Sequence, residues 1–162
     1  MLSEVKVFDG DTNLVAGRPY TVHPAPAAKS SSPYADDGIR LTDGSVARVF
    51  SRRDITGWST GREHPITLDL LGRVACRKVT VWTLAGGLHG IRASEAVLVS
   101  LQDANGNWRE VGRAERPGDL VEKGGLVALP YSVQLDGTAP RALRATIIRE
   151  IGWAMVSEVQ VE

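Results

Sequence analysis

The chain has 162 residues, of which 43% are hydrophobic and 23% charged, values typical of a globular domain. Basic and acidic residues both number 19. This balance argues against a general nucleic-acid binder, which needs a basic surplus to displace counterions from phosphate. The single cysteine, Cys76, excludes an intrachain disulfide and a cysteine-rich zinc site. No run approaches the roughly 18 apolar residues of a membrane span, and no basic-then-apolar signal region follows Met1.

The N-terminal part of the chain contains short apolar segments separated by loops. The 17 glycines of the whole chain indicate many turns, which favours short strands over long helices. Residues 5–8 and 18–22 are expected to be extended, whereas the proline-rich residues 24–33 are expected to form a surface loop. Residues 34–64 are polar and glycine-rich. They are long for a connection inside a compact domain, and such segments often carry function.

From residue 65 onward, apolar residues recur with the period of β-strands. The segments concerned are 66–70, 79–82, 97–101, 108–111, 126–135, 143–148 and 155–161. Asn105-Gly106 lies between two of them and is a strong hairpin signal. No stretch of about a dozen residues has helical spacing. The pattern predicts one all-β domain over residues 1–162, a β-sandwich or jelly roll of about eight strands.

The order of several short motifs resembles that of discoidin-like domains, the C-terminal type of domain found in coagulation factors. The motifs lie in residues 13–21, 41–44, 65–72, 90–108 and 152–159. The resemblance extends from about residue 13 to residue 162 and implies a galactose-binding-like jelly-roll β-sandwich. Two departures are visible: Leu71 stands where the family strand runs straight into Gly72, and an arginine-rich stretch over 48–54 precedes Trp58.

The segment Tyr34-Ala35-Asp36-Asp37-Gly38 is similar to a run found in members attached to bacterial carbohydrate-active enzymes. That subset implies a non-catalytic carbohydrate-binding module, which holds an attached enzyme or a cell surface near a glycan. It also implies a secreted parent protein, located outside the cell or at its surface. The alternative on the same fold is a protein-interaction or adhesion module, which would be favoured by a contiguous exposed apolar patch.

The resemblance further implies a buried structural calcium ion. Calcium prefers several hard oxygen ligands from carboxylates, carbonyls and hydroxyls, and the expected ligands are Asp43, Ser45 and Glu158. The alternative is that Asp43 only caps its own turn and that Glu158 is solvated.

Sugar recognition needs flat aromatic faces and planar polar groups, and three segments between the predicted strands offer both. The expected ligand-binding residues are Tyr34, Asp36, Asp37, Trp58, Arg62, Glu63, His64, His89, Arg92 and Trp153. Trp58 is expected to be exposed, the alternative being that it plugs the edge of the sandwich. Trp153 is also expected to pack beneath the calcium loop. Trp82 and Trp108 are assigned to sheet packing.

Catalytic interpretations are weaker. No Gly-x-Ser-x-Gly elbow is present, so the chain is expected not to be an enzyme. Asp36 or Asp37 with Glu63 could form the carboxylate pair of a glycosidase, but loop acids are more often solvated. Cys76 is expected to be a small buried filler. The acidic residues of 36–43 and the basic residues of 48–53 mark an uneven region, where arginines could bind an anionic sugar.

Overall fold

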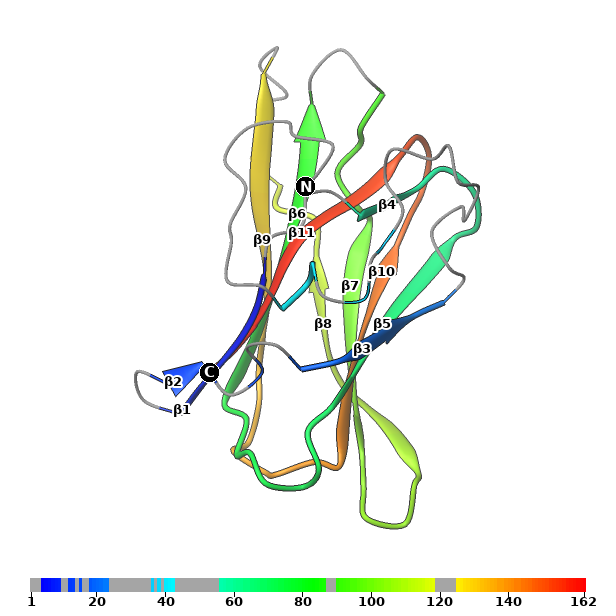
Figure 1. The fold of residues 1–162 in the computed structure, drawn as a ribbon. Helices are drawn as coiled ribbons and strands as arrows, with labels where there is room; N and C mark the ends of the chain where they lie inside the picture. The colour runs from blue at the N-terminus through cyan, green and yellow to red at the C-terminus, as the bar shows by residue number, and fades with distance from the viewer. Residues whose placement is uncertain are drawn as a thin grey trace.

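The computed structural model describes residues 4–9, 12–13, 15, 18–23, 36, 38, 40–42, 56–86, 90–118 and 125–162, with only the backbone described for 4–9, 12–13, 157–158 and 160. These residues form eleven strands and no helix (Figure 1). The strands are β1 (Glu4–Asp9), β2 (Thr12–Asn13), β3 (Tyr20–Val22), β4 (Thr56–Trp58), β5 (Glu63–Asp69), β6 (Lys78–Gly86), β7 (Ala96–Gln102), β8 (Trp108–Glu115), β9 (Leu126–Gln134), β10 (Ala142–Ile148) and β11 (Ala154–Val161).

The strands form two sheets that pack face to face. One sheet has the order β2-β1-β11-β6-β9, with β4 also pairing with β11, and the other has the order β3-β5-β10-β7-β8. Strands β1 and β11 are parallel, and the other strand pairs are antiparallel. Strands β1 and β5 through β11 each have six or more residues. These eight strands confirm the predicted all-β sandwich.

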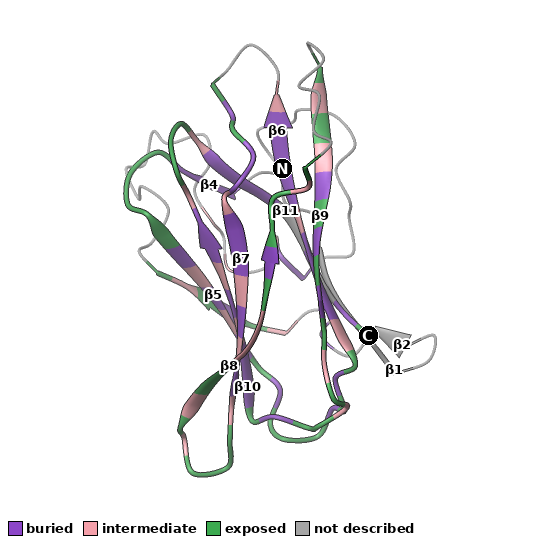
Figure 2. Cartoon of the chain, turned by 180° about the vertical axis from the view of Figure 1, so that it is seen from behind, coloured by how far each residue is buried: buried purple, intermediate pink, exposed green. Residues whose placement is uncertain are grey.

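The alternation in the sequence decides which side chains enter the core. On β5, His64, Ile66 and Leu68 are buried, while Thr67 between them is half-buried and Asp69 is exposed. The buried faces of both sheets meet in one core cluster, and Figure 2 shows the buried residues along the strands of both layers. Because water is excluded from both inner faces at once, the hydrophobic effect holds the two layers together.

The hairpin between β7 and β8 turns at Asp103–Asn107, as the Asn-Gly signal predicts. The Asp103 carboxylate accepts hydrogen bonds from the amides of Asn105 at 2.8 Å and Asn107 at 2.9 Å. Gly106 has a φ of 88°, a conformation that glycine adopts without steric cost. The turn is therefore fixed by its own side chain and by glycine.

The two sheets approach closely where β8 faces β9. A Cβ atom added to Gly112 would lie 2.2 Å from Cγ1 of Val133. Only glycine therefore fits at this position without displacing Val133.

The loops gather at two opposite ends of the sandwich (Figure 1). We call the end formed by residues 59–62, 90–95 and 149–153 the upper end, and the end formed by residues 70–77, 103–107 and 135–141 the lower end. Among the described residues, no helix has the length and apolar character needed to cross a membrane.

Candidate ligand-binding site

Part of the predicted site falls on described residues. Tyr34, Asp37, His89, Asp43 and Ser45 lie outside the described residues, and only the backbone of Glu158 is described. The remaining predicted ligand-binding residues are Asp36, Trp58, Arg62, Glu63, His64, Arg92 and Trp153, all of which are described.

Asp36 is half-buried and has a partner in the core. The Tyr20 hydroxyl donates a hydrogen bond to Oδ1 of Asp36 at 2.5 Å, and it accepts one from the Leu41 amide at 3.0 Å. Tyr20 lies on β3, so this pair attaches the region around residues 36–41 to the five-stranded sheet. The hydrogen bond gives Asp36 a structural role that sequence reasoning did not assign.

Trp58 is not exposed, and that expectation is wrong. Its side chain is only 3% exposed and belongs to the core cluster. The short strand β4 pairs with β11, with Trp58 opposite Ala154. The indole lies against the imidazole of His64, with ring centroids 4.9 Å apart and ring planes 16° apart. The arrangement agrees with the alternative considered for Trp58, in which the tryptophan fills the edge of the sandwich.

His64 is fully buried, so its predicted direct contact with a ligand conflicts with the structure. Neither ring nitrogen has a hydrogen bond of normal geometry among the described residues. The pKa of His64 is lowered from 6.5 to about 4, chiefly by burial and also by the charge of Arg149, while the Gly61 backbone acts in the opposite direction. The imidazole is therefore neutral at pH 7 and supports the site from beneath.

Arg149 connects two loops of the upper end and was not singled out from the sequence. Its Nε donates a hydrogen bond to the Gly61 carbonyl at 2.7 Å, and its guanidinium also bonds to the Gly152 carbonyl. Its amide donates to the Arg62 carbonyl at 2.7 Å. The Gly61 and Arg149 positions are 88 residues apart in sequence, so no local pattern could reveal this link.

Arg92 and Trp153 are brought together at the upper end. An isolated parallel bridge joins Ile91 to Trp153, and the Trp153 amide donates a hydrogen bond to the Gly90 carbonyl at 3.2 Å. A Cβ on Gly152 would lie 2.9 Å from Cγ of Arg92, so the glycine leaves room for the arginine side chain. Arg92 is exposed at this point.

Trp153 is half-buried and has a packing role, as predicted. It packs against a small apolar cluster formed by Leu84, Ile91 and Met155, separate from the main core. Whether it lies beneath a calcium loop is not tested, because Asp43 and Ser45 lie outside the described residues. Trp153 is only partly buried, and its carbonyl accepts a hydrogen bond from the Arg92 amide at 3.4 Å.

The rim of the upper end carries ion pairs. Arg62 pairs with Glu95 at 3.2 Å, and Glu95 also lies 3.6 Å from Arg113. A hollow of about 390 Å³ is lined by Gly61, Arg62, Glu95, Arg149 and Glu150. Glu63 is exposed at the start of β5. Exposed pairs of this kind contribute little to stability, so their side chains can exchange partners with a ligand.

The metal ligands predicted from the sequence are not tested, because Asp43 and Ser45 lie outside the described residues and only the backbone of Glu158 is described. Within those residues, no group of three or more His, Cys, Asp or Glu side chains could hold a metal ion. The backbone register places Glu158 opposite Glu4 on β1 and opposite Trp82 on β6.

Two packing predictions are confirmed. Cys76 is fully buried, and burial raises the pKa of its thiol to about 11, so it is an inert filler. The guanidinium of Arg144 lies 3.9 Å from the centroid of the Trp108 ring, which is half-buried on the sheet.

No protein-family model matches the chain, and no curated protein matches its sequence. Solved structures do match its fold. The lectin domain of lectinolysin complexed with Lewis B antigen is 17% identical, with a TM-score of 0.62 over 94% of this chain and 96% of that chain. The module CpGH89CBM32-5 from Clostridium perfringens, in complex with GalNAc-β-1,3-galactose, is 15% identical, with a TM-score of 0.59 over 90% and 94%.

A match inside a larger chain extends this likeness. A Ruminococcus gnavus GH29 fucosidase mutant in complex with fucose is 14% identical, with a TM-score of 0.55, over 93% of this chain but only 26% of that chain. The matched fold therefore also occurs as one part of an enzyme chain. At these identities the likeness establishes a shared fold, and the chain has the galactose-binding-like β-sandwich fold of these lectin domains and carbohydrate-binding modules.

Proposed function

We propose that the chain is a non-catalytic carbohydrate-binding module that binds a glycan at its upper end. The observation that carries this proposal is that the Arg92 amide donates a hydrogen bond to the Trp153 carbonyl at 3.4 Å, at one end of a fold shared with a lectin domain complexed with Lewis B antigen. The partly accessible indole offers a flat face to the C–H side of a sugar ring. The exposed guanidinium offers a planar set of donors to the hydroxyls.

The site is held in place before a ligand arrives. The bridge between Ile91 and Trp153 and the hydrogen bonds of Arg149 connect the loops that carry Arg92, Trp153 and Arg62. Ordering these loops in advance reduces the entropy lost on binding. Tyr34, Asp37 and His89 are proposed as further ligand contacts, and Trp58 and His64 support the site from the core.

We further propose that the module holds a structural calcium ion. Its proposed ligands are Asp43, Ser45 and Glu158, which together offer carboxylate and hydroxyl oxygens. The backbone register of β1 and β11 places Glu4 beside Glu158, which adds an acidic residue at this position of the sheet. Elemental analysis and chelation test this part separately: we expect bound calcium and a lower melting temperature after chelation. An unchanged melting temperature with no bound metal would refute it.

We also propose that the module works as part of a larger, secreted bacterial protein that acts on glycans. The match to one quarter of a fucosidase chain supports such an arrangement. We propose no catalytic role for the module itself, and the hydrogen bond from Tyr20 gives Asp36 a structural partner.

The rival function is adhesion to another protein through an apolar patch. Among the described residues, the exposed large hydrophobics are Leu71, Val127 and Ile151. Leu71 lies at the lower end and Ile151 at the upper end, so they do not join into a single surface. This distribution favours glycan binding over apolar docking.

A glycan array followed by calorimetry, with calcium present, tests the proposed function. We expect binding of at least one neutral saccharide, and about tenfold weaker binding for Trp153→Ala and for Arg92→Gln. Arg77→Gln is the matched control, because Arg77 is exposed at the lower end, away from the proposed site. Binding of no saccharide, or equal binding by all three variants, would refute the proposal.

A further inference from the structure

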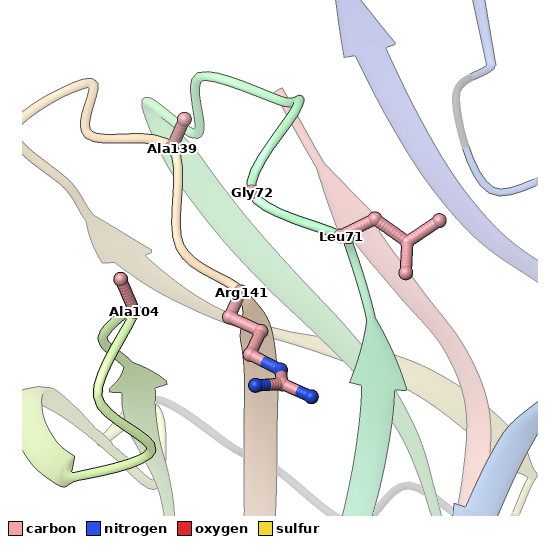
Figure 3. A pocket seen from close by; sticks show the side chains of 5 residues that line it. All are labelled: Leu71, Gly72, Ala104, Ala139 and Arg141. Atoms are coloured by element: carbon pink, nitrogen blue, oxygen red, sulfur yellow. The ribbon is translucent and has the colours of Figure 1, made fainter.

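The lower end of the sandwich contains a groove. Two adjoining hollows of about 440 Å³ and about 480 Å³ share Ala104 and Ala139 in their lining. Three segments far apart in sequence form the first hollow: the turn after β5, the β7–β8 turn and the segment before β10 (Figure 3). We call the two hollows together the lower groove.

The walls of the lower groove are held by backbone hydrogen bonds. The Gly72 amide donates to the Pro140 carbonyl at 3.1 Å, and the Leu70 amide donates to the Arg141 carbonyl at 2.8 Å. The Arg141 amide in turn donates to the Gln102 carbonyl at 2.9 Å. The three segments are therefore connected to one another, and the groove keeps its shape without a ligand.

The acidic side chains at this end are engaged by the turns that carry them. Asp103 accepts hydrogen bonds from two amides and from the Asn107 side chain, and Asp136 accepts one from the Thr138 amide at 3.0 Å. Asp69 accepts one from the Leu71 amide at 3.0 Å. The oxygens of these carboxylates accept hydrogen bonds from amides of their own turns. These amides partly offset the negative charges of the carboxylates.

Two basic side chains, Arg109 and Arg141, line the lower groove, and that of Arg141 is not engaged in this way. Within the described part of the chain, the Arg141 guanidinium has no hydrogen-bond or ion-pair partner. In Figure 3 its side chain extends between the turn that carries Ala104 and the turn that carries Leu71. An arginine fork with free donors suits a carboxylate, which it can bind through two parallel hydrogen bonds.

Leu71 is the second unusual feature of the groove. It has a φ of 56°, in the left-handed region that non-glycine residues rarely adopt, and its side chain is 54% exposed. A strained, exposed leucine costs stability, and such residues concentrate at functional positions.

We propose that the lower groove is a second ligand site, which takes the carboxylate of an acidic sugar residue on Arg141. The small apolar side chains of Ala104 and Ala139, with Leu71, would contact the C–H face of the sugar ring. The choice of a sugar over a peptide rests on the proposed function and on the walls of the groove. An extended peptide binds by pairing with an open strand edge, whereas the amides of Leu70, Gly72 and Arg141 are already bonded.

The position of the groove has a consequence for the assembled protein. It lies at the opposite end of the sandwich from Arg92 and Trp153. A chain with both sites would hold two glycan segments at once, and linked sites gain overall affinity from their high effective concentration.

Titration with trigalacturonate, followed by calorimetry and by amide chemical shifts, tests this proposal. We expect saturable binding with shifts at Ala104 and Ala139, and affinity about tenfold weaker in Arg141→Gln. Arg77→Gln removes the same charge from the same end without lining the groove, so it should bind as the unaltered chain does. Arg92→Gln should also keep this binding while binding the neutral glycan about tenfold more weakly, which separates the two sites.

Three outcomes would overturn the second site. Arg141→Gln could bind trigalacturonate as tightly as Arg77→Gln does, which would place the ligand elsewhere. Triglutamate could bind the groove as tightly as trigalacturonate, which would make the partner an acidic peptide. Acetate or sulfate could produce the same shifts at the same concentration, which would show an adventitious ion only.

Discussion

The imidazole of His64 stacks on the indole of Trp58 in the interior of the sandwich, with ring planes 16° apart. Trp58 ends β4, which pairs with β11 of one sheet, whereas His64 lies on β5 of the other sheet. The two rings therefore join the layers at the upper end and lie beneath the turn at residues 59–62. The same turn is held from above by Arg149 through the Gly61 carbonyl.

Replacing Trp58 by alanine should destabilise the whole domain. Removal of this buried indole leaves a cavity between the sheets, and we expect a loss of about 3–5 kcal/mol in the free energy of unfolding. Urea unfolding followed by circular dichroism measures it. Trp153→Ala is the comparison, because its half-buried indole should cost clearly less. Equal losses of unfolding free energy in the two variants would contradict the difference in burial between Trp58 and Trp153.

Stability should fall as the solution is acidified, in part through His64. Its folded-state pKa of about 4 lies below the ordinary value of 6.5, so between these two values the unfolded chain binds more protons than the folded chain. Stability is therefore fully present above pH 6.5 and is lost as the pH falls toward 4. The loss attributable to this residue is about 3 kcal/mol.

His64→Phe keeps an aromatic ring against Trp58 and removes the proton-binding site, so it is the control for this pH dependence. Urea unfolding of both proteins at pH 7.5 and pH 4.5 gives the comparison. The difference in stability between the two pH values should be smaller in the variant. The same pH dependence in both proteins would show that His64 is not responsible.

Gly112→Ala should destabilise the contact between β8 and β9. The added methyl group would lie 2.2 Å from Val133 Cγ1, and overpacking of this kind typically costs about 1–3 kcal/mol. Gly118→Ala is the matched control, because nothing lies within 4 Å of a Cβ placed there. Thermal unfolding of both variants measures this effect. A loss of stability in Gly118→Ala as large as that in Gly112→Ala would argue against the clash with Val133.

The Cys76 thiol should be unreactive in the folded protein. It is fully buried, and its pKa of about 11 leaves almost no thiolate at pH 8. We expect slow modification by a thiol reagent in buffer and rapid modification in concentrated urea, both followed by mass spectrometry. Rapid modification in buffer would mean that the loop around residue 76 opens in the folded state.

The candidate site could be predicted only in outline. Alternation and the Asn-Gly turn predict the strands and the β7–β8 hairpin, and the glycine-rich segments between strands point to the loops that carry Arg92 and Trp153. The sequence could not predict that Trp58 is buried rather than exposed. A three-residue strand has too few positions for its alternation to show which side faces the core.

The sequence by itself determined the class of the fold and the inward face of an alternating strand such as β5, because those depend on the local period of apolar residues. Only the tertiary structure decided that Trp58 is buried against His64, that Arg149 joins two loops, and that Arg141 lies in a groove with no side-chain partner among the described residues. These facts depend on contacts between residues far apart in the chain, and no local pattern records which distant segments the packing of two sheets brings together.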